Sequence, residues 1–195
     1  SVCGTAAVER VDLFRGSELI SSYPDPQTVK RSQDTIRVSW SGQRIRARNR
    51  LVRWDGGISL EGGKIIKALG YAFDSASEGI AETSEQSVTW QSVTTGDADG
   101  VVLELDAPDD ALLSFDTPVV QYTVSLGEIA AGPVVVEAGG IDIQVVFERE
   151  PLGVGSEVEF CFQEEELPAG CHPYWVRVVQ TDGAKAWASP IYVTV

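Results

Sequence analysis

The stretch of sequence that decides the fold is residues 174–193, YWVRVVQTDGAKAWASPIYV. Asp182 and Gly183 form a dipeptide that tight hairpin turns favour, because such turns need positive φ angles. The runs on either side are rich in β-branched and aromatic residues, which are typical of strands. The segment therefore predicts a β-hairpin that closes an all-β domain.

Period-two alternation of apolar and polar residues recurs along the whole chain. In residues 35–40 the apolar side chains are Ile36, Val38 and Trp40, which fall on one face of an extended strand. Similar sets are Val88 and Trp90; Val101, Leu103 and Leu105; Val120, Tyr122, Val124 and Leu126; and Ile141, Ile143, Val145 and Phe147. Turn-forming residues separate these sets. We predict an all-β fold, an antiparallel β-sandwich of immunoglobulin-like or jelly-roll-like type, with about a dozen strands and little or no helix.

Length and charge set the broad class of the protein. A chain of 195 residues suits a single β-sandwich domain over 1–195. It contains no methionine and begins with Ser1, so we expect a fragment of a longer protein. The chain has 15 basic and 29 acidic residues and a net charge of −14, which makes nucleic acid a poor partner. No apolar run approaches the roughly 18 residues that membrane insertion requires. The acidity slightly favours an extracytoplasmic or secreted location.

Arginines are concentrated in residues 44–54 of this acidic chain. The candidate binding residues are Arg44, Arg46, Arg48, Arg50, Arg53 and Trp54. On a strand, the first four of these would project from one face. Guanidinium groups bind carboxylates, sulfates and phosphates and stack on aromatic rings. The segment is therefore a candidate for binding a polyanionic glycan or an acidic partner surface, and an arginine ladder neutralised by neighbouring carboxylates is the alternative.

No recognisable catalytic group of residues emerges from the sequence. The only histidine is His172, and no Gly-x-Ser-x-Gly elbow supplies a nucleophile. Asp97 and Asp99 are a weak candidate for calcium, because they match only the opening of a calcium loop and simple turn chemistry is the alternative. We predict no catalytic residues, no firm metal site and no cofactor.

The cysteines leave two alternatives open. Cys161 and Cys171 flank residues 163–170, whose Pro168 and Gly170 suit a turn. The two cysteines could face each other across a hairpin and form a disulfide, or they could be free thiols. Zinc is disfavoured, because the three cysteines show no CxxC spacing.

Two segments carry a resemblance to a known family. They are residues 48–56, RNRLVRWDG, and residues 174–183 together with 186–191; residues 8–16, VERVDLFRG, agree with them. These segments resemble the C-terminal region of a bacterial family of domains of unknown function. Full-length members of that family resemble the PHP (polymerase and histidinol phosphatase) metal-dependent phosphoesterases, whose His and Asp ligands lie toward the N-terminus. Residues 57–170 are unmatched, and a chain with one histidine has no counterpart of those ligands.

Three functions follow from these observations. The resemblance implies a non-catalytic β-sandwich accessory domain that packs against or positions the catalytic domain of a PHP-like metal-dependent hydrolase, so that its own N-terminal catalytic domain is its partner. The second function is a secreted glycan- or polyanion-binding module that uses the arginine-rich strand. The third is a small jelly-roll enzyme that acts on polysaccharide, which requires a groove with a positioned pair of carboxylates, or with Tyr and Arg.

Overall fold

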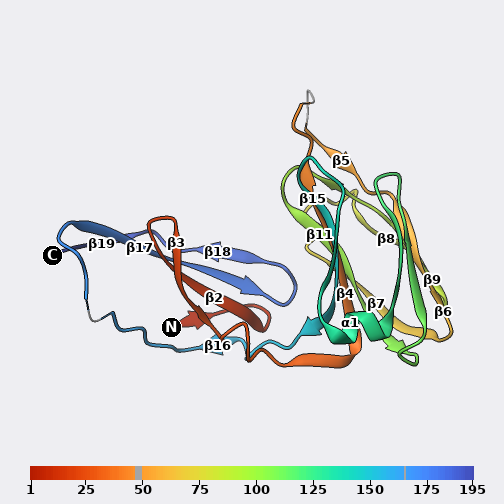
Figure 1. Ribbon diagram of the computed structural model, residues 1–195, viewed down its shortest axis with the longest axis horizontal. Helices are drawn as coiled ribbons and strands as arrows, with labels where there is room; N and C mark the ends of the chain where they lie inside the picture. Colours follow the sequence, from red (N-terminus) through yellow and green to blue (C-terminus); the bar gives the residue numbers. More distant parts are fainter. Residues whose placement is uncertain (47–49, 165) are drawn as a thin grey trace. The chain divides into compact units, whose positions relative to one another are not determined.

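The fold is all-β. This computed structural model describes residues 1–46, 50–164 and 166–195 (Figure 1). The described residues form 19 strands and one short helix, so the predicted β-rich antiparallel fold is confirmed. The number of strands exceeds the predicted dozen because several are only two or three residues long. Within the described ranges, no helix has the length and apolar composition needed to cross a membrane.

The chain separates into two compact units. Unit 1 consists of residues 1–31 and 151–195, and unit 2 consists of residues 32–150. A single domain over 1–195 is the expectation from the sequence, whereas the structure gathers the two ends of the chain into a unit of their own. The reason is that strands from the two ends pair with each other.

Unit 2 is a sandwich of two five-stranded sheets (Figure 1). One sheet has the order β14 (Val134–Glu137), β15 (Ile141–Pro151), β4 (Arg31–Gln43), β11 (Ala98–Asp106) and β7 (Lys64–Tyr71). The other has the order β13 (Gln121–Ser125), β12 (Leu112–Asp116), β6 (Gly56–Glu61), β9 (Ser87–Gln91) and β8 (Gly79–Thr83). Two further short strands, β5 (Val52–Arg53) and β10 (Val93–Thr94), pair with each other. The buried side chains of both sheets belong to one apolar cluster, so the sheets face each other across it.

The core of unit 2 follows the alternation read from the sequence. Ile36, Val38 and Trp40 of β4 are fully buried, and Trp40 stacks on Trp90 of β9 with ring centroids 4.4 Å apart. The opposite face of β4 is also covered, because the Arg37 guanidinium is buried and forms an ion pair of 2.7 Å with Glu148. The α-helix, α1 (Leu126–Ala131), begins with a capping box at Ser125 and buries Leu126 and Ile129 in the same core.

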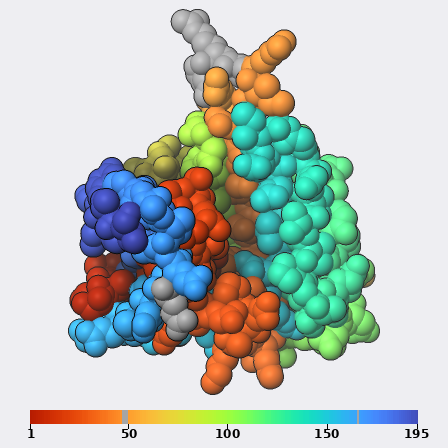
Figure 2. All heavy atoms as spheres, turned by 60° about the vertical axis from the view of Figure 1, so that its left-hand side comes forward, coloured from red at the N-terminus to blue at the C-terminus, as the bar shows by residue number. Residues whose placement is uncertain are grey.

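Unit 1 is built on a sheet with the order β18 (Lys185–Trp187), β17 (Cys171–Gln180), β2 (Val8–Arg15) and β3 (Glu18–Tyr23). β19 (Ile191–Thr194) also pairs with β17, and β1 (Val2–Cys3) pairs with β16 (Glu157–Val158). In Figure 2 the N-terminal segment, in red, lies against the C-terminal segment, in blue. The predicted hairpin is confirmed as the pairing of β17 with β18, and Gly183 in its turn has a φ of 86°.

The two faces of the unit 1 sheet differ in character. On one face Val11 packs with Val158, against which Phe160, Val176 and Val178 also lie. Strand alternation places Arg10, Asp12 and Phe14 of β2 on the opposite face. Because residues directly opposite each other on paired strands share a face, Arg177 and Trp175 of β17 join them there. This second face carries the polar groups of unit 1.

Candidate functional site

The described residues of the arginine-rich segment do not form the predicted strand. Arg44, Arg46 and Arg50 are exposed and lie outside the strands, between β4 and β5, and Arg48 lies outside the described residues. The backbone N–H of Arg44 donates to the carbonyl of Arg50 at 2.9 Å, so the two ends of this segment are bonded to each other. The expected comb of guanidinium groups along one strand face is therefore wrong for the described residues.

Trp54 and Arg53 also differ from the expected binding surface. Trp54 is fully buried, and its Nε1–H donates to the Thr94 hydroxyl at 2.9 Å, so its ring cannot stack on a ligand. Arg53 is exposed on β5 and forms an ion pair of 2.9 Å with Asp55. Trp54 thus belongs to the core of unit 2, and Arg53 is a surface residue paired with Asp55.

Asp97 and Asp99 do not form a calcium loop. Asp97 accepts hydrogen bonds from the Thr95 backbone and hydroxyl, which is ordinary turn chemistry. Asp99 is fully buried on β11, where its Oδ2 accepts from the Ser92 hydroxyl at 2.6 Å, and that hydroxyl in turn accepts from Trp40 Nε1 at 2.8 Å. In the part of the chain that the structure describes, no three His, Cys, Asp or Glu side chains are grouped to hold a metal ion.

Asp99 nevertheless has an unusual electrostatic environment. Burial raises its pKa, nearby Glu78, Asp97 and Asp74 raise it further, and the resulting pKa is about 7. Its Oδ1 and the Oε2 of Glu78 are both buried and accept no hydrogen bond from the described residues. A carboxyl group with a raised pKa is typical of catalytic acids. Asp99, however, is closed off from solvent among the core tryptophans, and we interpret it as part of the structure of unit 2.

The cysteines are free thiols, and the disulfide alternative is wrong in this structure. Cys3, Cys161 and Cys171 are all exposed and unbridged. Cys171 is the first residue of β17, where it lies opposite Thr194 of β19, and Cys161 belongs to no strand. The two cysteines therefore do not face each other across a hairpin, which is the geometry that the predicted disulfide requires.

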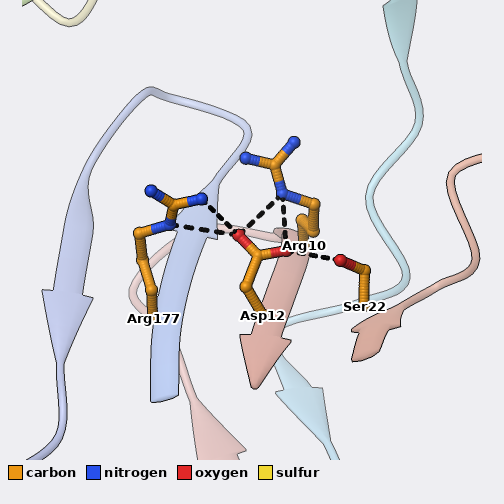
Figure 3. A network of polar contacts seen from close by, with 4 residues as sticks. All are labelled: Arg10, Asp12, Ser22 and Arg177. Carbon is orange, nitrogen blue, oxygen red and sulfur yellow. Dashed lines mark hydrogen bonds and ion pairs between the residues drawn. The ribbon is translucent and has the colours of Figure 1, made fainter. Parts of the chain in front are cut away.

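A well-connected group of polar side chains lies on the second face of the unit 1 sheet (Figure 3). Asp12 is fully buried at the centre of this group. Its Oδ2 accepts from Arg177 Nε at 3.1 Å and from Arg177 Nη2 at 2.8 Å. Arg10 Nε lies 3.0 Å from each of the two Asp12 oxygens, and the Ser22 hydroxyl donates to Oδ1 at 2.7 Å. One carboxylate thus holds two guanidinium groups, which come from strands at opposite ends of the chain.

Electrostatics keep Asp12 ionised. Burial by itself raises the pKa of a carboxyl group, but hydrogen bonds from Ser22 and Arg177 and the charge of Arg10 outweigh burial. The pKa of Asp12 is therefore below its ordinary value. At neutral pH the centre of the group is a fixed negative charge that orients the two arginines.

Both arginines keep hydrogen-bonding capacity beyond Asp12. The side chains of Arg10 and Arg177 are 39% and 33% exposed. Arg10 uses Nε toward Asp12, which leaves Nη1 and Nη2 without a partner among the described residues, and Arg177 likewise leaves Nη1. Figure 3 shows both terminal nitrogens of Arg10 and one terminal nitrogen of Arg177 pointing away from the carboxylate. The group therefore presents several N–H donors to solvent in a fixed arrangement.

Aromatic side chains lie next to this group. Phe14 and Trp175 stack with ring centroids 4.1 Å apart, and the guanidinium carbon of Arg177 lies 5.1 Å from the centre of the Phe14 ring. The Trp175 indole N–H donates to the Gly16 carbonyl at 2.7 Å. Packing and hydrogen bonds thus hold the neighbourhood of Arg177 in place. We name Arg10, Asp12, Ser22 and Arg177 the arginine pair site.

The sequence contains weak signals for this site. Arg10 and Asp12 occupy alternate positions of a strand-like run, and Arg177 lies in the C-terminal hairpin between Trp175 and Val179. No local pattern indicates that the two runs are neighbours, because 165 positions separate Asp12 from Arg177. From the sequence alone, binding is therefore predicted at residues 44–54, where arginines are most concentrated.

Comparison with protein-family models, with curated proteins and with solved structures finds no match for this chain.

Proposed function

We propose that this chain is a non-catalytic binding module and that its arginine pair site binds an anionic group, such as a carboxylate, sulfate or phosphate. The observation that carries the proposal is that one buried aspartate orients two partly exposed arginine side chains. Nη1 and Nη2 of Arg10 and Nη1 of Arg177 donate to no described residue. Guanidinium N–H groups held in this way match the oxygens of a planar or tetrahedral anion.

The polarity of the site supports an anion over a neutral ligand. Both Asp12 oxygens are occupied by Arg10, Arg177 and Ser22, so the carboxylate is not available to a ligand. The groups that remain open to solvent are guanidinium N–H donors of Arg10 and Arg177. A neutral polyol offers hydroxyl groups that need both donors and acceptors, whereas an anion needs donors only.

The local charge favours the same class of ligand. Lys185 on β18 lies opposite Val179, which lies opposite Arg10, so the three residues form one row across the sheet face. Lys185, Arg10 and Arg177 are three cations, and Asp12 is the single acid that the arginines contact among the described residues. This is a positively charged area on a chain with a net charge of −14.

The proposal retains the binding function predicted from the sequence and moves it from the arginine-rich segment to unit 1. The accessory role beside a PHP-like hydrolase domain rests on the resemblance of residues 8–16, 48–56 and 174–191, and it stays a prediction. A binding module is compatible with that role, because such a module can hold a substrate near a catalytic domain.

The test uses the Nε–H signals of arginine in proton–nitrogen NMR spectra of the whole chain. Sodium acetate, sulfate and phosphate are titrated against sodium chloride at constant ionic strength. We expect saturable shifts of the Arg10 and Arg177 signals, and we expect Arg177→Gln to weaken binding by at least about tenfold.

The matched control is Arg53→Gln, which changes an exposed arginine of unit 2 that also contacts an aspartate. This variant should bind like the unmodified chain. Shifts that grow linearly without saturation, or that are equal in the two variants, would overturn the proposal. An unchanged spectrum of unit 1 outside the site confirms that Arg177→Gln remains folded.

A further inference from the structure

Trp187 extends the arginine pair site toward the edge of the sheet. It lies on β18 directly opposite Arg177 of β17, and residues that are paired in this way share a face of the sheet. Trp187 is 61% exposed, which is unusual for the largest apolar side chain. Trp40, Trp54 and Trp90 are buried and Trp175 is half-buried, so Trp187 is the most exposed of the five tryptophans.

The position of Trp187 at the rim makes its ring accessible. All three residues of β18 are exposed. The indole therefore stands at an open border, where a ligand can reach it from solvent.

The spacing of the sheet sets what a shared ligand must look like. Paired residues have Cβ atoms about 5 Å apart, and diagonal neighbours lie about 7–8 Å apart. A ligand that contacts both Trp187 and the guanidinium of Arg177 must therefore carry its negative charge directly beside a flat apolar surface. Lys185, the diagonal neighbour of Arg177, offers a further cation at similar range.

We propose, on the basis of the proposed function above, that the ligand is an oligosaccharide containing a uronic acid. In a uronic acid the carboxylate is attached to the sugar ring, and the C–H groups of the ring form an apolar face. The carboxylate binds Arg10 and Arg177, and the ring stacks on Trp187 as sugar rings stack on exposed aromatic side chains. Neighbouring sugars of the chain extend along the rim of the sheet.

Other anions use less of this surface. Free phosphate or sulfate has no apolar face and leaves Trp187 without a role. A nucleic acid could stack a base on Trp187, but its dense phosphate charge meets the repulsion of a chain with a net charge of −14. A uronic acid within an oligosaccharide has a carboxylate for Arg177 directly beside an apolar ring face for Trp187.

The experiment measures binding of tetrasaccharides by calorimetry at constant ionic strength. The probes are tetragalacturonate, tetramannuronate and a glucuronate-containing tetrasaccharide, each compared with its uncharged methyl ester. Sodium sulfate and a short oligothymidylate are the competing anions. We expect at least one acidic tetrasaccharide to bind about tenfold or more tightly than its ester, than sulfate and than oligothymidylate.

Substitutions separate this inference from the proposed function. Trp187→Ala should lower the affinity for the acidic tetrasaccharide by about tenfold, while sulfate still shifts the Arg177 Nε–H signal. Trp187→Phe should restore part of the affinity, and Arg177→Gln should remove the binding of both sulfate and sugar.

Three results would overturn the inference. They are equal binding of the sugar by Trp187→Ala and the unmodified chain, failure of all three tetrasaccharides to bind more tightly than sulfate, and tighter binding of oligothymidylate. In each of these cases the proposed function survives if sulfate or another anion still saturates the arginine signals. If no anion binds at all, both proposals fail.

Discussion

Replacement of Asp99 by asparagine should stabilise unit 2 at alkaline pH and change it little at acid pH. The folded state raises the pKa of Asp99 from 3.8 to about 7, first through burial and then through the repulsion of Glu78, Asp97 and Asp74. The folded state therefore binds this proton more tightly than the unfolded state does. The stabilisation that results is complete below about pH 4 and is lost as the pH rises through about 7.

The magnitude follows from the difference between the two pKa values. A shift from 3.8 to about 7 corresponds to about 4 kcal/mol of unfolding free energy between the two ends of this range. The substituted asparagine side chain would be neutral at every pH, and its amide oxygen can still accept from the Ser92 hydroxyl. Asp99→Asn should therefore exceed the unmodified chain in stability by a few kcal/mol at pH 8 and should match it near pH 4.

The assay is urea unfolding followed through the indole N–H signals of Trp40, Trp54 and Trp90 in proton–nitrogen NMR spectra. These three tryptophans belong to the core of unit 2, so their signals report on that unit alone. Asp110→Asn, at an exposed position of the same unit, is the matched control for loss of one negative charge. Parallel curves of stability against pH for Asp99→Asn and the unmodified chain would refute the reasoning.

Three further predictions concern single contacts. Ser125→Ala removes the N-cap of α1 and should lower the stability of unit 2 by about 1 kcal/mol, whereas loss of less than a few tenths in urea unfolding would contradict the capping box as a stabilising contact. Asp12→Asn should destabilise unit 1 at pH 7 and much less in acid, because a lowered pKa gives stability that is lost as the pH falls through the folded pKa. The indole signals of Trp175 and Trp187 report this loss, and an equal loss at every pH would contradict it. A maleimide should label all three thiols of the native chain without reductant. Labelling of only one thiol would show instead that Cys161 and Cys171 form a disulfide.

Local pattern was sufficient to predict most of the strands. Ile36, Val38 and Trp40 are buried because they fall on one face of β4, and the same holds for Val101, Leu103 and Leu105 of β11. The hairpin of β17 and β18 was likewise evident, since the residues on each side of its turn pair with one another. These features depend on residues that are close in the sequence, so they can be predicted from a single sequence.

The prediction of a strand failed for the described residues of the arginine-rich segment, and there is a physical reason. Between Arg44 and Arg50 the alternation of arginines leaves Ile45 as the one large apolar side chain, and Ile45 is 60% exposed. A strand is stabilised mainly by the apolar face that it buries, and this segment has almost none. Alternation of charged residues alone therefore does not predict a strand.

Division into two units could not be predicted from local pattern. It depends on the pairing of β2 with β17, which brings together the two ends of the chain. Period-two alternation indicates that a strand buries one face, but it does not indicate which strand becomes its neighbour. The arginine pair site was missed for the same reason, since Arg10 and Arg177 meet only when this pairing is known.

Two fully buried aspartates show how distant neighbours decide the chemistry of a side chain. Asp12 lies between two guanidinium groups, and its pKa is lowered, whereas Asp99 lies near three other carboxylates, and its pKa is raised. Part of this difference is local, because Arg10 stands two positions before Asp12 and Asp97 two positions before Asp99. The remaining charges, those of Arg177, Glu78 and Asp74, come from distant positions that the local sequence does not indicate. The ionised state of Asp12 is what holds Arg10 and Arg177 in position for a ligand. Anion binding at the arginine pair site should therefore persist through mildly acid pH and fall when Asp12 takes up a proton, because the two guanidinium groups then lose the charge that orients them.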